Sequence, residues 1–320
     1  MAPSATTTTT AALAPSTKTA SGNTSFKLKP DSIPRAKDEE SQTKQQTPLQ
    51  AISHGNLSLP GVPSFPDFAS QRQWQLEHMA AAFRHWDRMG YVEGMSGHIS
   101  VRDPEIHDAF WTNPIGVHFG MLNASDMILV NFQGEVIGGN QSRPPNAAGV
   151  WIHGSIHKAW PHVHAVCHCH SVYGKTWSVF GKPLEMLTQD TCKFFGDAQA
   201  VYDNHGGVVL AAEEGERIAS ALGPTAKGCV LRNHGLLTVG QTVDEAAWLF
   251  TSMENSCRVQ LLADAAAAND ELKKVLISDT EARFNFEAEG DPEVCHAEFQ
   301  VYYDYEDRRC QGEFKDFKGL

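Results

Sequence analysis

Three histidines have the residue type and the spacing that metal binding requires. His168 and His170 stand two residues apart in an apolar run typical of a buried strand, so both side chains would leave the same face. His234 follows a second apolar run, residues 228–231, at a turn that contains glycine. Nitrogen ligands from a strand and a turn can hold one ion with coordination positions left open, as catalytic metal sites do.

Chance spacing is an alternative reading of this pattern. The chain has 15 histidines, and a buried histidine is often a hydrogen-bonded core residue. The Asn-His-Gly-Leu segment at residues 233–236 favours a metal site, because it supplies a ligand at a strand end. The same alternation places Cys167 and Cys169 on the opposite face of the strand, where we expect them to pack in the core.

Composition limits the functions that this chain can have. It has 320 residues, of which 41% are hydrophobic, and a formal net charge of −12, which argues against nucleic acid or an anionic membrane as a partner. Seven cysteines without a Cys-x-x-Cys pair suit a reducing compartment. No apolar run approaches the ~20 residues that span a bilayer, and no secretory signal is recognisable. We expect a cytoplasmic protein that acts on a small-molecule substrate.

The sequence divides into three parts. Residues 1–64 are rich in Thr, Ser, Pro, Gln and Lys and are predicted to form a disordered, low-complexity tail. Residues 65–275 carry the helix and strand patterns of one domain. Residues 276–320 are predicted to be an extension that packs on the domain or on a neighbouring subunit. Its aromatic segment, residues 299–304, is expected to be a final edge element.

The patterns within the domain predict an α/β fold. A long amphipathic helix is expected over residues 68–89, and further helices over residues 150–160, 213–222 and 244–268. Strand-like runs lie between them, including one at residues 206–210. Strands interleaved with helices predict a three-layer α/β/α sandwich, with helices on both faces of the sheet.

Several segments resemble the class II aldolase/adducin N-terminal domain family. The matching segments are SGHISVR at 96–102, TNPIG at 112–116, SD at 125–126, HCH at 168–170 and NHGL at 233–236. They occur in family order between residues 70 and 275. The resemblance implies a mixed, mostly antiparallel sheet and a cyclic homotetramer with active sites near subunit interfaces. It also implies a metal ion, usually Zn²⁺, bound by His168, His170 and His234.

The chain departs from the aldolases of this family at two places. Their acid/base glutamate lies nineteen residues before the first metal histidine, and Gly149 stands at that position here. Their Gly-Asn phosphate contact is replaced by Gly97 and His98. The implied general base and much of the phosphate site are therefore missing. At the first segment the chain is closer to adducin heads, which are regarded as non-enzymatic.

Two other histidines are candidates to replace the missing base. His153 lies one helical turn after Gly149 and could point at the same cavity, and His98 replaces a phosphate contact with an imidazole. An imidazole has an ordinary pKa of about 6.5, which suits proton transfer near neutral pH. His98 and His153 are therefore the predicted catalytic residues, with a structural role in the core as the alternative for each.

Three hypotheses for the function follow. The leading one is a metal-dependent lyase of the aldolase type, acting on a non-phosphorylated carbonyl or hydroxy-acid substrate with Zn²⁺. The second is a mononuclear Fe²⁺ oxygenase, because three histidines without a carboxylate can also hold iron. The third is a non-enzymatic, adducin-like interaction module, which Gly149 favours and the intact histidine triad opposes.

Overall fold

The computed structural model describes residues 46–209, 211–269 and 271–317. The predicted disordered tail therefore lies mostly outside the described residues. Its last part contains a helical turn, α1 (Pro48–Ala51), where the sequence predicted no structure. Thr47 accepts a hydrogen bond from the Gln50 backbone N–H, and the Gln50 side chain accepts one from Thr47 in return. This capping box stabilises the turn locally, without the apolar periodicity on which the prediction relied.

One eight-stranded sheet forms the centre of the fold, in the order β4-β3-β2-β1-β5-β8-β7-β6. The strands are β1 (His98–Arg102), β2 (Ala109–Thr112), β3 (Ile128–Asn131), β4 (Val136–Gly139), β5 (Ala165–Cys169), β6 (Gln199–Tyr202), β7 (Gly228–Leu231) and β8 (Gly235–Gly240). All neighbouring strands are antiparallel except β6 and β7, which are parallel. The prediction of a mixed, mostly antiparallel sheet is confirmed.

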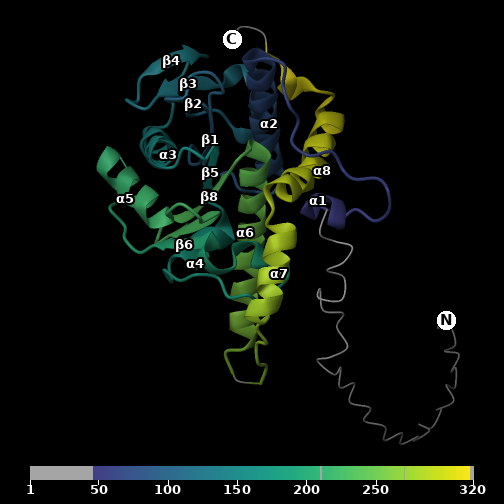
Figure 1. The fold of residues 1–320 in the computed structure, drawn as a ribbon. Coiled ribbons are helices and arrows are strands. Elements are labelled where there is room, and N and C mark those ends of the chain that lie inside the picture. Colours follow the sequence, from purple (N-terminus) through teal and green to yellow (C-terminus); the bar gives the residue numbers. More distant parts are fainter. Residues whose placement is uncertain (1–45, 210, 270, 318–320) are drawn as a thin grey trace, which may run out of the picture. The chain divides into compact units, whose positions relative to one another are not determined.

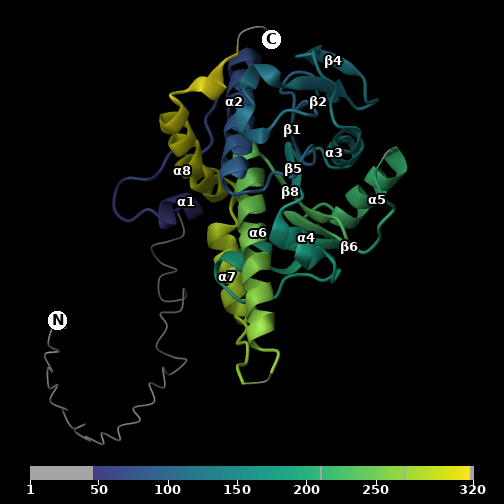
Figure 2. The same cartoon turned by 180° about the vertical axis from the view of Figure 1, so that it is seen from behind.

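Helices cover both faces of this sheet, which confirms the three-layer sandwich (Figures 1 and 2). One face packs against α3 (Ala147–Ala159) and α5 (Ala212–Leu222), and the other against α2 (Phe68–Arg88), α4 (Val172–Ser178) and α6 (Val243–Ala266). Among the described residues, none of the helices is both long enough and apolar enough to cross a bilayer.

Strand β5 separates two apolar cores. Ala165, Cys167 and Cys169 belong to the core under α2 and α6, whereas Val166 belongs to the core under α3 and α5. Side chains alternate along a strand, so His168 lies on the same side as Val166. Both cysteines pack in the core, away from the histidines, as the alternation predicted.

The C-terminal extension is helical. It forms α7 (Asp279–Glu289) and α8 (Pro292–Cys310), and α8 packs against α2 and α6 of the same chain. The prediction of a final edge element at residues 299–304 is wrong, because this segment lies in the middle of α8. Its aromatic side chains recur at helical spacing. Phe299 is fully buried, and Tyr302 packs beside it. Asp291 accepts hydrogen bonds from two backbone N–H groups and Pro292 occupies the first position, so the helix start is well defined.

One predicted strand, at residues 206–210, is also wrong. No strand forms at residues 206–209; β6 lies upstream instead and pairs with β7. The Gly-Gly-Val-Val run looked like a buried strand, yet Val208 is largely exposed. Edge strands are short and carry little apolar patterning, which explains why β6 gave no clear signal.

Candidate metal centre

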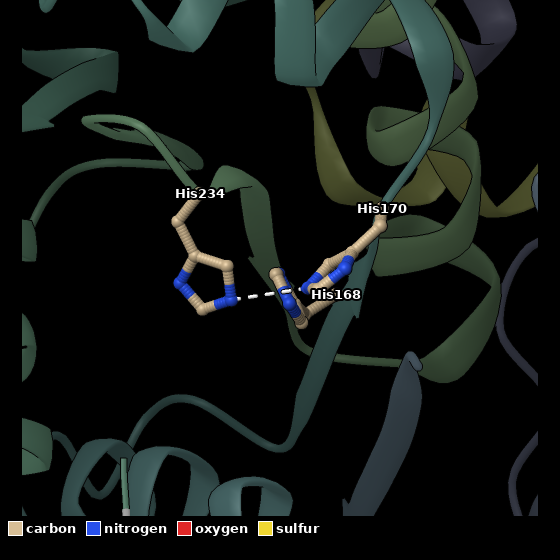
Figure 3. Close-up of side chains that lie close together, drawn as sticks. All are labelled: His168, His170 and His234. Carbon is tan, nitrogen blue, oxygen red and sulfur yellow. Dashed lines mark hydrogen bonds between the residues drawn. The ribbon is translucent and has the colours of Figure 1, made fainter. Parts of the chain in front are cut away.

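The structure brings His168, His170 and His234 together at one end of β5. One possible ligand atom from each ring lies within 4.8 Å of those of the other two. The Nε2 atoms of His170 and His234 are 3.1 Å apart (Figure 3). His168 comes from β5 itself, His170 from the residue after the end of this strand, and His234 from the turn between β7 and β8. The predicted set is therefore gathered in space.

Strand pairing explains how His234 reaches the other two rings. β8 runs antiparallel to β5 with Leu236 opposite Cys169, so the turn before Leu236 lies beside the end of β5. Asn233 adopts a φ of 58°, a left-handed conformation that asparagine tolerates better than most residues. The tight turn then points the side chain of His234 back toward β5.

A hydrogen bond orients one of the rings from behind, and a carboxylate lies near a second ring. His168 donates from Nδ1 to the backbone oxygen of Leu236 over 2.7 Å, which leaves its Nε2 lone pair for a ligand bond. The Nδ1 atom of His170 lies 3.8 Å from Oε2 of Glu93, which also contacts Lys175. Carbonyl and carboxylate partners of this kind commonly orient metal-binding histidines. Neither Glu93 nor Lys175 could be found from the sequence, because neither belongs to a spaced motif.

The chemistry of the donor set fits a divalent ion. Tetrahedral zinc with Zn–N bonds of 2.0–2.1 Å separates ligand nitrogens by about 3.3 Å, close to the 3.1 Å between His170 and His234. Burial lowers the pKa of all three imidazoles, that of His234 to about 4, so they are neutral at pH 7. Metal binding requires neutral imidazole. Three nitrogens with no carboxylate in the group suit Zn²⁺ or Fe²⁺.

His98 lies beside this centre. It is the direct partner of His168 across the β1–β5 pair, and their ring centroids are 5.0 Å apart. A Cβ atom on Gly149 would lie 2.8 Å from Cγ of His98. The His98 ring therefore occupies the space that a side chain at position 149 would need. Gly149 and His98, the two departures from the aldolase pattern, are therefore sterically linked: the histidine ring fits because position 149 has no side chain.

His153 lies behind His98 rather than beside the metal ligands. Its Nε2 is 2.8 Å from Nδ1 of His98, and its Nδ1 is 2.7 Å from Oγ of Ser100. Both ring nitrogens are occupied and the side chain is fully buried. The predicted direct catalytic role does not fit this geometry, because no nitrogen remains to meet a substrate. The sequence placed His153 near the centre but could not show which way its ring turns.

Acidification is expected to destabilise the metal-free protein. Burial lowers the pKa of His98 and His153 well below 6.5, and that of His157 to about 3. Between pH 6.5 and 4 the unfolded chain binds more protons than the folded one, so stability falls as the pH falls. Each neutral buried histidine contributes a slope of about 1.4 kcal/mol per pH unit. Thermal melting between pH 7 and 4.5 measures this; a midpoint independent of pH would contradict it.

The fold and the gathered histidines define an α/β protein of the class II aldolase type. The chain belongs to the Class II Aldolase and Adducin N-terminal domain family, whose sequence model matches residues 77–261.

Three known proteins show the range of this similarity. Decarboxylase NovR of Streptomyces niveus is 43% identical over 229 residues, which are 69% of this chain and 83% of the relative. The 4-hydroxy-3-prenylphenylpyruvate oxygenase/4-hydroxy-3-prenylbenzoate synthase of Streptomyces roseochromogenus subsp. oscitans is 44% identical over 206 residues, 64% of this chain and 73% of the relative. The structure of L-fuculose 1-phosphate aldolase from Glaciozyma antarctica PI12 superposes with a TM-score of 0.71 and 40% identity, covering 79% of this chain and 96% of that one.

Proposed function

We propose that the protein is a metal-dependent lyase that cleaves a C–C bond next to the carbonyl group of a non-phosphorylated 2-oxo or hydroxy acid. The observation that carries the proposal is the position of His98. Its ring packs beside that of His168, one of the three gathered histidines, in the space that position 149 would need for a carboxylate side chain. His98 replaces the missing acid/base glutamate.

The metal ion and His98 would have different roles: the ion would stabilise negative charge, and His98 would transfer a proton. A divalent ion bound by His168, His170 and His234 would polarise a substrate carbonyl and stabilise the negative charge that develops on it. His98 is neutral and uses Nδ1 toward His153, so its Nε2 is the nitrogen that accepts a substrate proton. General acid/base catalysis contributes typically ~10²–10⁴-fold in rate. Burial lowers the pKa of His98 well below 6.5, which weakens it as a base and places its contribution toward the lower end of this range.

The substrate class follows from what the site lacks. Residue 98 is an uncharged, buried imidazole in place of the phosphate-binding asparagine, and Gly97 has no room for a side chain beside Cys169 and Phe119. With Nδ1 of His98 directed at His153, this neutral ring has no N–H left to donate to a phosphate group, as an asparagine amide would. Two relatives are named for a decarboxylase and for a phenylpyruvate oxygenase, and phenylpyruvate is a 2-oxo acid. We therefore favour a 2-oxo or hydroxy acid.

A mononuclear Fe²⁺ oxygenase is the second candidate. The relative named for an oxygenase favours it, and a group of three histidines can hold Fe²⁺ as well as Zn²⁺. Turnover of 2-oxo acids by protein loaded with Zn²⁺ or Fe²⁺, with and without oxygen, separates the two. Activity with Zn²⁺ under anaerobic conditions supports the lyase. Activity that needs both iron and oxygen supports the oxygenase and overturns the lyase.

A non-enzymatic, adducin-like module explains less of the site. Such a module has no use for three gathered imidazoles whose pKa values are lowered, one of them held by a hydrogen bond to the backbone oxygen of Leu236. Well-folded protein that binds neither Zn²⁺ nor Fe²⁺ would overturn both metal-dependent proposals and favour such a module.

Replacement of His98 tests the proposed base. His98→Gln is expected to lower kcat by ~10²–10⁴-fold and to leave the metal content at the wild-type level, because His98 is not one of the three gathered ligands. Steady-state kinetics on any 2-oxo acid found to react, together with elemental analysis, measures both. The exposed His162 serves as the control, since His162→Gln removes an imidazole away from the centre. Unchanged kcat in His98→Gln would remove His98 from the mechanism.

We also propose a cytoplasmic homotetramer with active sites near subunit interfaces. Support comes from exposed apolar side chains on segments next to the centre: Met95, Val172 and Phe180 are each more than half exposed in the single chain. Surfaces of this kind often mark association sites. Light scattering of the purified protein tests the proposal, and a monomer at micromolar concentration would contradict it.

A further inference from the structure

We propose that Ser100 and His157 are positioning residues that act through His153 to hold His98 in a single tautomer, with its Nε2 lone pair available at the metal centre. This inference rests on the proposed role of His98 as the base. It concerns a line of four polar side chains between β1 and α3, all of them buried.

The line arises from matching spacings on a strand and a helix. On β1, His98 and Ser100 share a face because they are two residues apart, which is a rise of about 6.6 Å. On α3, His153 and His157 share a face because they are four residues apart, which is a rise of about 6.0 Å. The two rows therefore stay in step. His98 meets His153, and Ser100 meets both His153 and His157.

A backbone carbonyl sets the direction of every hydrogen bond in this line. The oxygen of Val163 can only accept, so His157 donates to it from Nδ1 over 3.2 Å. The Nε2 atom of neutral His157 then accepts from the Ser100 hydroxyl over 2.8 Å. The Ser100 oxygen in turn accepts from Nδ1–H of His153 over 2.7 Å. Nε2 of His153 is left as the acceptor for Nδ1–H of His98, over 2.8 Å.

The outcome at the far end is a defined proton position on His98. A neutral imidazole carries one N–H, and that of His98 is on Nδ1. Its Nε2 therefore presents a lone pair. No hydrogen bond from this Nε2 to another described residue is found, so the lone pair is not consumed inside the protein.

Arg102 keeps the line from reversing. Its guanidinium donates to the backbone oxygens of His157 and Val163, so a positive charge lies beside His157. Burial, with this charge added, holds the pKa of His157 at about 3. His157 therefore stays neutral and keeps Nδ1–H toward Val163. His157, the fixed end of the line, and His98, its functional end, therefore lie on opposite sides of Ser100.

Removing the Ser100 hydroxyl should release this control. In Ser100→Ala, Nδ1–H of His153 has no acceptor, and the ring can move its proton to Nε2. His153 would then donate to Nδ1 of His98, which forces the His98 proton onto Nε2 and blocks the lone pair. A buried donor without a partner is costly, so the exchange is driven toward the second tautomer.

Imidazole ¹⁵N NMR of selectively labelled, metal-free protein reads these tautomers directly. In the wild type we expect the Nδ1–H form at His98, His153 and His157, although free imidazole side chains in water favour Nε2–H. In Ser100→Ala we expect His98 and His153 to shift to Nε2–H, and kcat to fall by about tenfold or more with KM and metal content unchanged. A wild-type spectrum with Nε2–H at His98 would overturn the inference.

Two further variants keep the test decisive. Thr251→Val removes another buried hydroxyl that contacts a histidine, His85, on the other face of the sheet, and should leave the three tautomers as they are. If Ser100→Ala does not fold, His157→Phe removes the same line at its other end, in a site that already packs on Phe110. Tautomers that stay unchanged in a folded variant overturn the positioning role. Tautomers that shift in a protein without lyase activity overturn only the proposed function.

Discussion

Replacing His234 by alanine is expected to abolish metal binding and turnover together. His234 is one of only three nitrogen donors gathered in the described chain, and a pair of histidines alone binds divalent ions far more weakly. Loss of the ion removes the charge stabilisation that it supplies, worth several kcal/mol, so kcat/KM should fall by at least ~10³-fold. His234 lies in a turn and is only partly buried, so the fold should survive.

Metal-dependent melting separates this effect from a general loss of structure. An ion that binds only the folded state raises the melting temperature of the wild type, and this rise should vanish in His234→Ala. His205→Gln is the matched control, because His205 is exposed and its ring lies 6.5 Å from that of His234 without joining the ligand group. A variant without His234 that retained one ion per chain and full turnover would disprove the assignment of this ligand.

Replacing Gly149 by alanine should lower both the stability and the activity of the protein. The new Cβ would lie 2.8 Å from Cγ and 3.0 Å from Cδ2 of His98, so the ring must move. Overpacking of this kind costs about 1–3 kcal/mol, which outweighs the gain of up to ~1 kcal/mol from replacing glycine inside a helix. Displacement of His98 should also lower kcat by ~10²-fold or more. Denaturant unfolding and steady-state kinetics measure the two losses.

A second glycine on the same helix provides the control. Gly154 also lies within α3, but a Cβ there would meet Phe110 at an ordinary 3.4 Å. Gly154→Ala should therefore be neutral or stabilising. Adding His98→Asn to Gly149→Ala should recover part of the lost stability, giving a coupling energy of at least ~1 kcal/mol in a double-mutant cycle. Strictly additive losses would show that the two positions do not compete for space.

The metal ligands could be found from the sequence because their geometry is local. Alternation along one strand puts His168 and His170 on one side, and a glycine-containing turn follows the strand that ends before His234. The long helix α2 was equally clear from its apolar period and confirmed at residues 68–88. The helix α8 was missed although its aromatic side chains follow a helical period, since an acidic segment before it was taken as a linker.

The surroundings of His98 could not be predicted from the sequence, because they are formed by contacts between segments that are far apart in the chain. Their interpretation needed the register of β1 against β5, the axial position of α3 over β1, and the absent side chain of Gly149. The i, i+4, i+8 series of Gly149, His153 and His157 was visible in the sequence, but nothing there showed that it would lie over His98 and Ser100. Glu93 lies between α2 and β1 and Lys175 lies in α4, and neither belongs to a motif.

X-ray diffraction of metal-loaded crystals, with anomalous data at the zinc and iron edges, would show whether the three histidines hold an ion. We expect one ion per chain, with the Nε2 atoms of His168, His170 and His234 about 2.0–2.2 Å away and at least one open position facing His98. Crystals soaked in either metal that show no anomalous peak among these three rings, or a peak held by other side chains, would contradict this expectation.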